Sequence, residues 1–202
     1  MTVSPLIQAV EQADSAPRLT AAVGALAAAH EVEAIPTLIQ VLGYNNPGAA
    51  VAAVEGLVQL GEVAVPQLLA QIDGYNYGAR AWANRALARI GDPRALETLL
   101  EAASSDFALS VRRAAAKGLG SLNWSKLAAS EVEAAQQRVF AVLMQVCDDP
   151  EWVVRYAAVV GLAALRATAP TYQEQIEVRL QQLLANDPEM AVRARSHWAL
   201  SS

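Results

Sequence analysis

The stretch Asp149-Pro-Glu-Trp-Val-Val-Arg-Tyr-Ala-Ala158 contains the pattern that decides the fold. Its arginine is preceded six residues earlier by an aspartate, and a small residue and a leucine follow it at three and seven residues. The arginine, small residue and leucine occur four times, as Arg80/Ala83/Leu87, Arg112/Ala115/Leu119, Arg155/Ala158/Leu162 and Arg193/Ser196/Leu200. Self-similarity at a period of about thirty residues is typical of solenoids built from small helical units.

Two earlier copies keep the apolar positions and lack the arginine, Ile7/Ala22/Leu26 and Leu38/Ala53/Leu57. In each unit a first segment has apolar residues at helical spacing, and a second is rich in alanine and glycine. The complete Asp-Pro-x-x-x-Val-Arg-x-x-Ala pattern resembles HEAT-type repeats. We therefore expect an all-α fold, a right-handed α-solenoid of about six HEAT-like helical hairpins, which forms a single domain over residues 1–202.

Local signals place the ends of these helices. Asp149 and Asp187 each precede a proline, which is typical of a helix N-cap with proline at the first helical position. Gly61 and Gly91 are placed to end second helices, because glycine tolerates the left-handed conformation found there.

Longer intervals between the recurring leucines indicate two inserts, near Asn123–Glu133 and Ala167–Gln173. Each ends in a sequence that predicts a capping box, Ser130-x-x-Glu133 and Thr171-x-x-Glu174. We expect the next helix to begin at each box.

The composition fits a continuous apolar core, with 54% hydrophobic and 17% charged residues among 202. The longest apolar stretches are too short to span a bilayer, and the N-terminus lacks the pattern of a secretory signal. The single cysteine, Cys147, excludes an internal disulfide and a cysteine zinc cluster, and it fits a reducing compartment. We expect a cytoplasmic protein without membrane insertion, in which Cys147 is a buried small hydrophobe.

The net charge of −5 argues against nucleic acid as a partner, because phosphates need a basic face. Residues 1–79 carry one basic and seven acidic residues, whereas residues 80–117 carry seven basic and four acidic residues. An acidic first third beside a basic middle predicts two different surfaces.

Three sets of residues are candidates for function. The aspartate–arginine series allows two interpretations, an anion site or a structural ladder of ion pairs and caps between repeats. Aromatic residues at the turns and early second helices suit a large planar ligand or a protein contact, or they seal the turns. The basic pairs Arg85/Arg89 and Arg113/Lys117 suit ligand carboxylates or form a solvated face. The aromatic residues in question are Tyr75, Tyr77, Trp82, Phe107, Trp152 and Tyr156.

The middle of the chain goes beyond a generic repeat. The stretches Tyr75-Asn-Tyr-Gly-Ala-Arg-Ala-Trp-Ala83 and Asp106-Phe-Ala-Leu-Ser-Val-Arg-Arg-Ala-Ala-Ala-Lys-Gly-Leu119, followed by Trp124, resemble the E/F-type phycobilin lyases, and most closely their F-type (beta) subunits. The resemblance covers nearly the whole chain. It implies an enzyme active as a heterodimer with an E-type (alpha) subunit, which attaches phycocyanobilin through a thioether to a cysteine of the apo-phycocyanin alpha subunit.

The resemblance also suggests roles for individual residues. Phycocyanobilin is then a substrate, with no permanently bound cofactor and no metal. Asp106 and Asp149 are the candidate catalytic residues, because a carboxylate paired with pyrrole N–H groups favours the protonated, more electrophilic bilin. Arginines suit the propionates and aromatic residues suit stacking. The candidate bilin-binding residues are Tyr75, Asn76, Tyr77, Arg80, Trp82, Arg112, Arg113, Trp124, Arg155 and Tyr156.

The family implies two further expectations and leaves two alternatives. No cysteine occurs between residues 74 and 82, so we expect attachment without isomerisation, in a cyanobacterial-type cell or a plastid stroma. The acidic N-terminal third is the candidate surface for the E-type partner. The alternatives are a non-catalytic HEAT-repeat adaptor, and a bilin chaperone or detachment protein in phycobilisome assembly or turnover.

Overall fold

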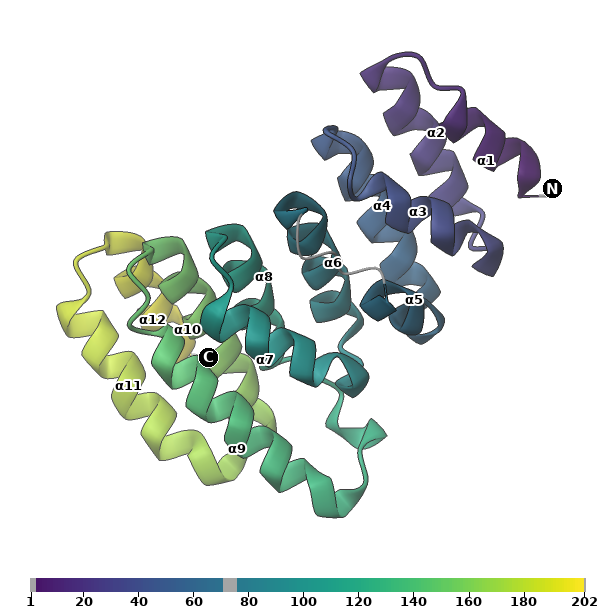
Figure 1. Cartoon of the computed structure of the whole chain (residues 1–202). Helices are drawn as coiled ribbons and strands as arrows, with labels where there is room; N and C mark the ends of the chain where they lie inside the picture. The colour runs from purple at the N-terminus through teal and green to yellow at the C-terminus, as the bar shows by residue number, and fades with distance from the viewer. Residues whose placement is uncertain (1–2, 71–75, 202) are drawn as a thin grey trace. The chain divides into compact units, whose positions relative to one another are not determined.

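The computed structural model describes residues 3–70 and 76–201, and within these ranges every regular element is a helix (Figure 1). The chain divides into two compact units, Met1–Ile90 and Gly91–Ser202. Each unit is a stack of helical hairpins, so the predicted all-α solenoid fold is confirmed. A single domain over residues 1–202 stays a prediction, and the two units are described separately.

The first unit consists of helical hairpins. In the second and third of these, a 3-10 turn precedes the first helix of the hairpin. Its elements are α1 (Ser4–Glu11), α2 (Ala16–Ala28), η1 (Val32–Ala34), α3 (Ile35–Val41), α4 (Pro47–Leu60), η2 (Gly61–Ala64), α5 (Val65–Ala70) and α6 (Tyr77–Ile90). The second helices α2, α4 and α6 pack against one another in chain order.

The second unit repeats this arrangement with longer helices. Its elements are η3 (Pro93–Ala95), α7 (Leu96–Ser105), α8 (Leu109–Leu119), η4 (Trp124–Lys126), α9 (Ala129–Val146), α10 (Trp152–Thr168), η5 (Pro170–Tyr172), α11 (Gln173–Asn186) and α12 (Met190–Ser201). The second helices α8, α10 and α12 again pack in chain order, and α7 and α9 pack side by side.

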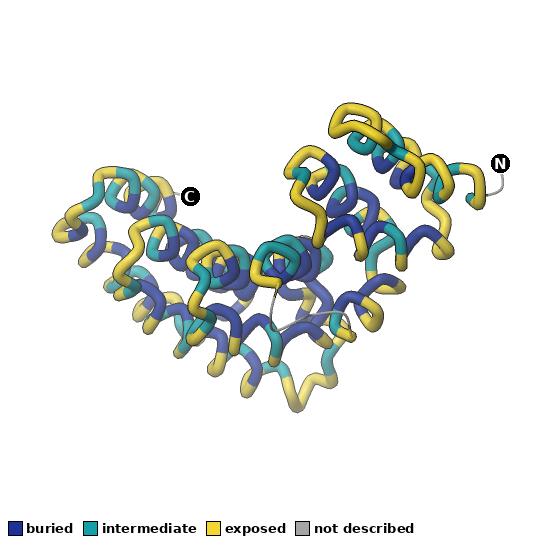
Figure 2. The backbone as a smooth tube through the Cα atoms, turned by 45° about the horizontal axis from the view of Figure 1, so that its top comes forward, coloured by how far each residue is buried: buried dark blue, intermediate teal, exposed yellow. Residues whose placement is uncertain are grey.

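The recurring leucine of the sequence pattern forms the core of each unit. Leu87, Leu119 and Leu162 are completely buried, and Figure 2 shows buried stretches along the second helices. Burying one leucine side chain stabilises a fold by about 2 kcal/mol. The period seen in the sequence is therefore the period at which second helices place a leucine in the core.

Helix ends follow the sequence signals in part. Gly61 and Gly91 follow second helices and both have φ of 69°, a positive value that favours glycine. Asn46 caps α4 by accepting a hydrogen bond from Ala49 N–H at 3.0 Å. Asp149 instead closes a turn that precedes α10, since its carboxylate accepts from Glu151 N–H at 2.9 Å. The Asp149 carboxylate therefore stabilises the turn that leads into α10, and it does not cap the helix itself.

The two predicted capping boxes are wrong. Helix α9 begins at Ala129, before Glu133, and no side chain caps it. Helix α11 begins at Gln173, after Thr171, and it also has no side-chain cap. A short 3-10 turn precedes each helix: η5 leads directly into α11, whereas Leu127 and Ala128 separate η4 from α9.

The first insert is fixed to the start of the second unit. Asn123 N–H donates to Gly91 O at 2.7 Å, and the Lys126 ammonium lies 3.6 Å from the Asp92 carboxylate. Hydrogen bonds from the Arg94 side chain lower the pKa of Asp92 to about 2, although its burial opposes this effect. The insert is therefore an ordered part of the unit.

One apolar segment, Pro47–Ala70, is long enough by length and composition to cross a membrane. It is interrupted at Gly61, where α4 ends and η2 begins. Helix α4 packs on both α2 and α6. Core helices of soluble proteins pass the same test of length and composition, so the segment is accounted for by repeat packing.

Two helices of the second unit approach each other closely where α8 ends against α10. A Cβ atom added at Gly161 would lie 2.4 Å from Ala116 O, and one added at Gly120 would lie 1.8 Å from Gly161 O. Both distances are far below van der Waals contact, and both obstacles are backbone atoms, which cannot move aside cheaply. Glycine at these positions sets the spacing of the two helices.

We predict that Gly161→Ala lowers the free energy of unfolding of the second unit by about 2–3 kcal/mol, because the added methyl group forces α8 and α10 apart. The measurement is urea unfolding followed by circular dichroism. Gly24→Ala is the matched control, since no atom lies within 4 Å of its added Cβ. The control should gain about 0.5–1 kcal/mol from helix propensity. Equal unfolding midpoints for wild type and Gly161→Ala would contradict this account.

Candidate functional site

The recurring arginine holds the turn between the two helices of a hairpin. Arg112 Nη1 donates to the backbone oxygens of Asp106 and Phe107 at 2.8 and 3.1 Å. Its Nε and Nη2 donate to the two carboxylate oxygens of Asp149 in the next hairpin, at 2.7 and 3.1 Å. One guanidinium therefore closes its own turn and joins it to the following turn.

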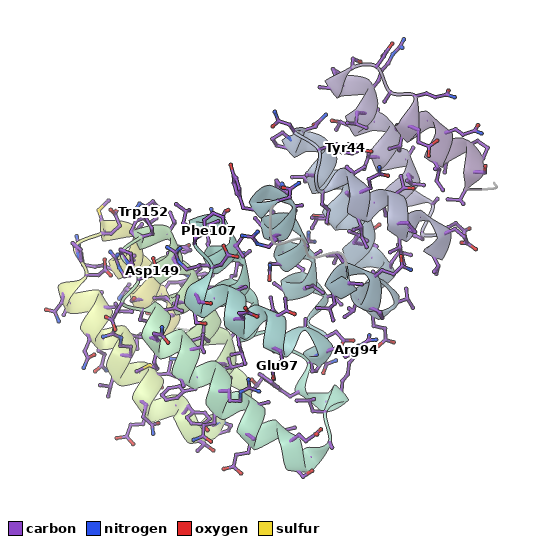
Figure 3. All side chains as sticks on the ribbon, viewed as in Figure 1. Tyr44, Arg94, Glu97, Phe107, Asp149 and Trp152 are labelled. Atoms are coloured by element: carbon purple, nitrogen blue, oxygen red, sulfur yellow. The ribbon has the colours of Figure 1, made fainter. Side chains whose placement is uncertain are left out.

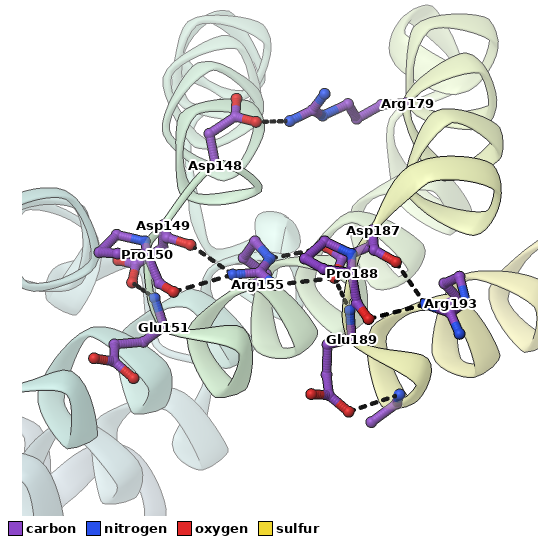
Figure 4. Close-up of polar contacts among 11 residues, drawn as sticks. Asp148, Asp149, Pro150, Glu151, Arg155, Arg179, Asp187, Pro188, Glu189 and Arg193 are labelled. Atoms are coloured by element: carbon purple, nitrogen blue, oxygen red, sulfur yellow. Dashed lines mark hydrogen bonds and ion pairs between the residues drawn. The ribbon is translucent and has the colours of Figure 1, made fainter.

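Arg155 repeats this arrangement one hairpin later (Figure 4). Its Nη1 donates to the backbone oxygens of Asp149 and Pro150, at 2.9 and 3.2 Å. Its Nε and Nη2 donate to the carboxylate of Asp187 at 2.8 and 2.9 Å. We call this series the arginine ladder. The structural interpretation of the aspartate–arginine series is thus confirmed for these residues, and each carboxylate comes from the following hairpin.

The ladder lies in a partly buried environment. The side chains of Arg155 and Asp187 are 12% and 2% exposed. Burial by itself would raise the pKa of Asp187, but hydrogen bonds from Arg155 and from Glu189 N–H outweigh it and hold the pKa below its usual value. Asp187 is therefore charged, and both Asp149 and Asp187 are engaged by ladder arginines, which makes them parts of the framework.

Exposed apolar side chains lie next to the turns that the ladder holds in the second unit. Leu109, Trp152 and Met190 each stand three residues before a ladder arginine, at the first position of a second helix, and are 42%, 43% and 71% exposed. Phe107 and Tyr156 add aromatic rings that are 75% and 37% exposed. We call these five residues the apolar rim. In Figure 3, Phe107 and Trp152 lie near Asp149 at the same end of the unit. Such a row of exposed apolar groups indicates a binding surface.

In the first unit an open pocket of about 250 Å³ joins the turn after α3 to the start of α6. Tyr44, Tyr77 and Trp82 line it, together with Asn76. Asn76 caps α6 by accepting from Ala79 N–H at 2.9 Å. The guanidinium of Arg85 lies 5.4 Å from the centre of the Trp82 ring. We call this set of residues the aromatic pocket, which combines π faces with a nearby cation.

Three predicted ligand residues fall elsewhere. Trp124 is only 8% exposed and its indole N–H donates to Thr168 Oγ1 at 3.1 Å, so the expectation that it stacks on a ligand is wrong. Arg80 is 7% exposed and belongs to the buried part of α6. Tyr75 lies outside the described residues.

The basic pairs separate into different roles. Arg89 forms an ion pair with Glu55, whereas Arg85, the other member of the basic pair, is exposed beside Trp82. Arg113 and Lys117 are both exposed on α8 and are available to an anion. Of this basic pair, Arg89 therefore has a structural role and Arg85 is a candidate binding residue.

Cys147 lies in the core. It is 1% exposed, and burial raises the pKa of its thiol to about 11, despite the nearby Arg179. A thiol of this kind is protonated near neutral pH and is a poor nucleophile. Among residues 3–70 and 76–201, no three His, Cys, Asp or Glu side chains are grouped to hold a metal ion.

Comparison with known proteins identifies the family. The HEAT repeats family matches residues 65–163. Phycocyanin alpha phycocyanobilin lyase CpcF of Synechocystis sp. is 56% identical, over 99% of this chain and 94% of that protein. Phycocyanobilin lyase subunit beta of Nostoc sp. is also 56% identical, over 94% of both chains. The chain belongs to the phycobilin lyase family.

A solved structure supports the assignment to the phycobilin lyase family. A chain in the complex of CpcE and CpcF of phycocyanin lyase from Nostoc sp. PCC7120 is 57% identical, with a TM-score of 0.80. The match covers 84% of this chain and 99% of that chain. The fold and the sequence resemblance therefore agree over most of the molecule.

Sequence reasoning missed some surface residues of this family member. The arginine-based pattern does not single out Tyr44, which precedes the first arginine-bearing repeat, although its Gly-Tyr-Asn-Asn-Pro turn is typical of an exposed position. Leu109 and Met190 are aliphatic, so the pattern of aromatic residues does not include them. Their register, three residues before a ladder arginine, is the signal that would have found them.

We predict that Asp187→Asn lowers the free energy of unfolding at neutral pH by about 3 kcal/mol, because Arg155 loses its charged partner in a partly buried site. The folded-state pKa of Asp187 is lowered, so its contribution is complete above the unfolded pKa of about 4 and is lost as the pH falls through the folded value. The difference between wild type and variant should therefore shrink as the pH falls below about 4.

The measurement is urea unfolding at several pH values between neutral and acidic. Glu97→Gln is the control, because the Glu97–Arg138 pair is exposed on both sides and contributes less than about 1 kcal/mol. A stability difference for Asp187→Asn that stays constant with pH would contradict the charged ladder.

Proposed function

We propose that this chain is the F-type subunit of a heterodimeric lyase that attaches phycocyanobilin to a cysteine of the phycocyanin alpha subunit, without isomerisation. The observation that carries the proposal is the 56% identity to a phycocyanin alpha phycocyanobilin lyase over nearly the whole of both chains. The relative solved as a complex of CpcE and CpcF supports an E-type partner. We also propose that the activity is cytoplasmic.

The aromatic pocket fits one end of a tetrapyrrole. Tyr77 is 58% exposed and faces the same pocket as Tyr44 and Trp82, so pyrrole rings can stack on it. Arg85, on the next turn of α6 beyond Trp82, is placed to receive a propionate. A pocket of about 250 Å³ holds part of a bilin and leaves the remainder on the surface.

The reaction needs positioning more than chemistry from this chain. The thiolate of the substrate cysteine adds to the ethylidene carbon of the bilin, a C–S bond forms, and a proton is added to the conjugated system. Fixing the bilin and the thiolate together replaces a costly bimolecular encounter. The thiol comes from the phycocyanin alpha subunit, since the one cysteine of this chain is buried.

The two proposed catalytic carboxylates differ in their surroundings. Both oxygens of Asp149 accept from Arg112, so we assign Asp149 to the ladder and propose no proton transfer through it. Asp106 is half-buried beside the exposed Phe107, and its carboxylate accepts from Ala108 N–H at 2.8 Å. We keep Asp106 as the candidate carboxylate that pairs with pyrrole N–H groups and favours the protonated bilin.

The proposal is tested by co-expressing this chain with an E-type subunit, the apo-phycocyanin alpha subunit and a phycocyanobilin supply. We expect a covalent adduct only when both lyase subunits are present, detected by zinc-induced fluorescence of the alpha-subunit band after denaturing electrophoresis. No adduct together with a colourless chain would favour the adaptor alternative. Loss of bilin from holo-phycocyanin would favour detachment.

We predict that Tyr77→Ala lowers the rate of adduct formation about tenfold, because loss of one stacking ring in the pocket costs about 1.4 kcal/mol. Tyr77→Phe is the matched control and should keep most of the rate, since it retains the ring. The readout is the initial rate of adduct absorbance at fixed heterodimer concentration. Equal rates for the alanine and phenylalanine variants would remove Tyr77 from the bilin site.

We predict that Cys147→Ala keeps full adduct formation, because a buried thiol with a pKa of about 11 does not act as a nucleophile or carrier. The small cavity should cost about 1 kcal/mol of stability. The measurement is the adduct assay at a temperature well below the unfolding transition. Loss of the adduct with the heterodimer intact would assign the thiol a role in bilin transfer.

A further inference from the structure

Charge is divided between the two layers of helices in the second unit. The second helices α8, α10 and α12 contain seven basic residues and no acidic residue. The first helices α7, α9 and α11 contain six acidic residues and two basic residues. The whole chain has 20 acidic and 15 basic residues, so the second helices depart strongly from its composition. Their basic residues are Arg112, Arg113, Lys117, Arg155, Arg166, Arg193 and Arg195.

Structural contacts account for four of these seven side chains. Arg166 lies 3.7 Å from Glu177. The recurring arginines donate to backbone oxygens of their own turns, and these are Arg112, Arg155 and Arg193. Within residues 3–70 and 76–201, no carboxylate pairs with Arg113, Lys117 or Arg195. These three cations are therefore available to an anion from outside the chain.

The three cations share one face of the second unit with two aromatic rings. Arg113 stands one residue after a recurring arginine, as does the exposed Tyr156 on α10. Lys117 stands five residues after that arginine, the register that Trp198 has on α12. Helices α8, α10 and α12 pack in chain order, so equal registers lie side by side (Figure 1). We call Arg113, Lys117, Tyr156, Arg195 and Trp198 the second-helix face.

The aromatic rings lie close to one of the cations. The Arg195 guanidinium is 4.2 Å from the centre of the Trp198 ring. Burial lowers the pKa of Arg195, and the nearby Tyr156 opposes this effect. Trp198 and Tyr156 are 63% and 37% exposed, so both rings and the cation can reach a ligand. Tryptophan, tyrosine and arginine are the residue types that dominate protein-binding hot spots.

The spread of the cations favours a macromolecule over a single bilin. Packed neighbouring helices lie about 8–10 Å apart, so α8 and α12 are about 16–20 Å apart. The two propionates of a bilin are on adjacent pyrrole rings, and they cannot reach cations on both helices. Arg113 and Lys117 are four residues apart on α8, a spacing of about 6 Å that matches two carboxylates four residues apart on another helix.

We propose that the second-helix face binds a carboxylate-bearing helix of the apo-phycocyanin alpha subunit and so holds the substrate protein on the lyase. The inference rests on the proposed function for the identity of that substrate. A charged face with few aromatic anchors suits a protein that leaves after each attachment, because charged contacts speed association and weaken with salt. A permanent subunit interface is larger and more apolar.

The test compares the KM values of the complete heterodimer for its two substrates. Arg113→Glu and Lys117→Glu should each raise the KM for the apo-phycocyanin alpha subunit about tenfold, because a carboxylate would then face a carboxylate. The KM for phycocyanobilin should not change. Arg18→Glu is the matched control, since it makes the same charge change at a side chain that is 73% exposed on α2 of the first unit. It should keep both wild-type KM values.

Two further measurements test the contact itself. Added salt should raise the alpha-subunit KM of wild type more than that of Lys117→Glu, because the variant has less attraction to screen. Exposed aspartates and glutamates of the alpha subunit are then changed one at a time to lysine and assayed with Lys117→Glu. One exchange that lowers the KM at least about tenfold, with no such gain against wild-type Lys117, supports the proposal.

Four results would overturn the proposal. Wild-type KM values for both glutamate variants, or an equal rise with Arg18→Glu, would remove the face from alpha-subunit binding. A raised KM for phycocyanobilin alone would make the ligand a propionate. Loss of the heterodimer in size-exclusion chromatography would make the occupant the E-type subunit.

Failure of the proposed function has a different signature. In that case the wild-type heterodimer forms no adduct, and the dissociation constant of the apo-phycocyanin alpha subunit, measured by fluorescence titration, tests the second-helix face directly. Absence of binding there would overturn both proposals. Normal adduct formation together with unchanged variants would remove the second-helix face alone.

Discussion

The guanidinium groups of the ladder arginines connect one hairpin to the next. Arg112 and Arg155 are each held by two backbone oxygens of their own turn and reach the aspartate of the following turn. A solenoid repeat contacts only its neighbours, so its stability depends on such nearest-neighbour links. The leucine core supplies most of the hydrophobic free energy, and the ladder sets the register in which successive turns lie beside each other. Without that register the surface above the turns would not be ordered.

The candidate surfaces lie directly on this framework. Three residues of the apolar rim, Leu109, Trp152 and Met190, stand at the first positions of second helices. The aromatic pocket of the first unit uses the same location in the repeat, with Asn76 capping α6 and Tyr77 beginning it. A rigid turn can present an aromatic ring at low entropic cost, because the backbone beneath it is already ordered. Binding groups and structural groups therefore alternate along the same short segments.

This alternation explains why several predicted binding residues have structural roles in the protein. Arginines and aspartates are suited both to propionates and to each other, and the sequence did not separate the two uses. In the structure Arg112, Arg155 and Asp149 are engaged with one another, whereas Arg85 and Arg113 remain exposed. Trp124 changed role for a different reason, since the insert that carries it folds back on the second unit and buries the ring.

The sequence by itself determined the repeat, the helical hairpins, the glycine helix ends and the family, because these depend on local spacing and residue type. Only the tertiary structure decided that Arg112 pairs with the carboxylate of Asp149 and contacts Asp106 through its backbone oxygen, and that Trp124 is buried. It also showed that Leu109 and Met190 are exposed, as Trp152 is. These facts depend on how one hairpin lies against the next. That arrangement is set by the close approach of glycine backbones and by the direction of each side chain, which a one-dimensional pattern does not contain.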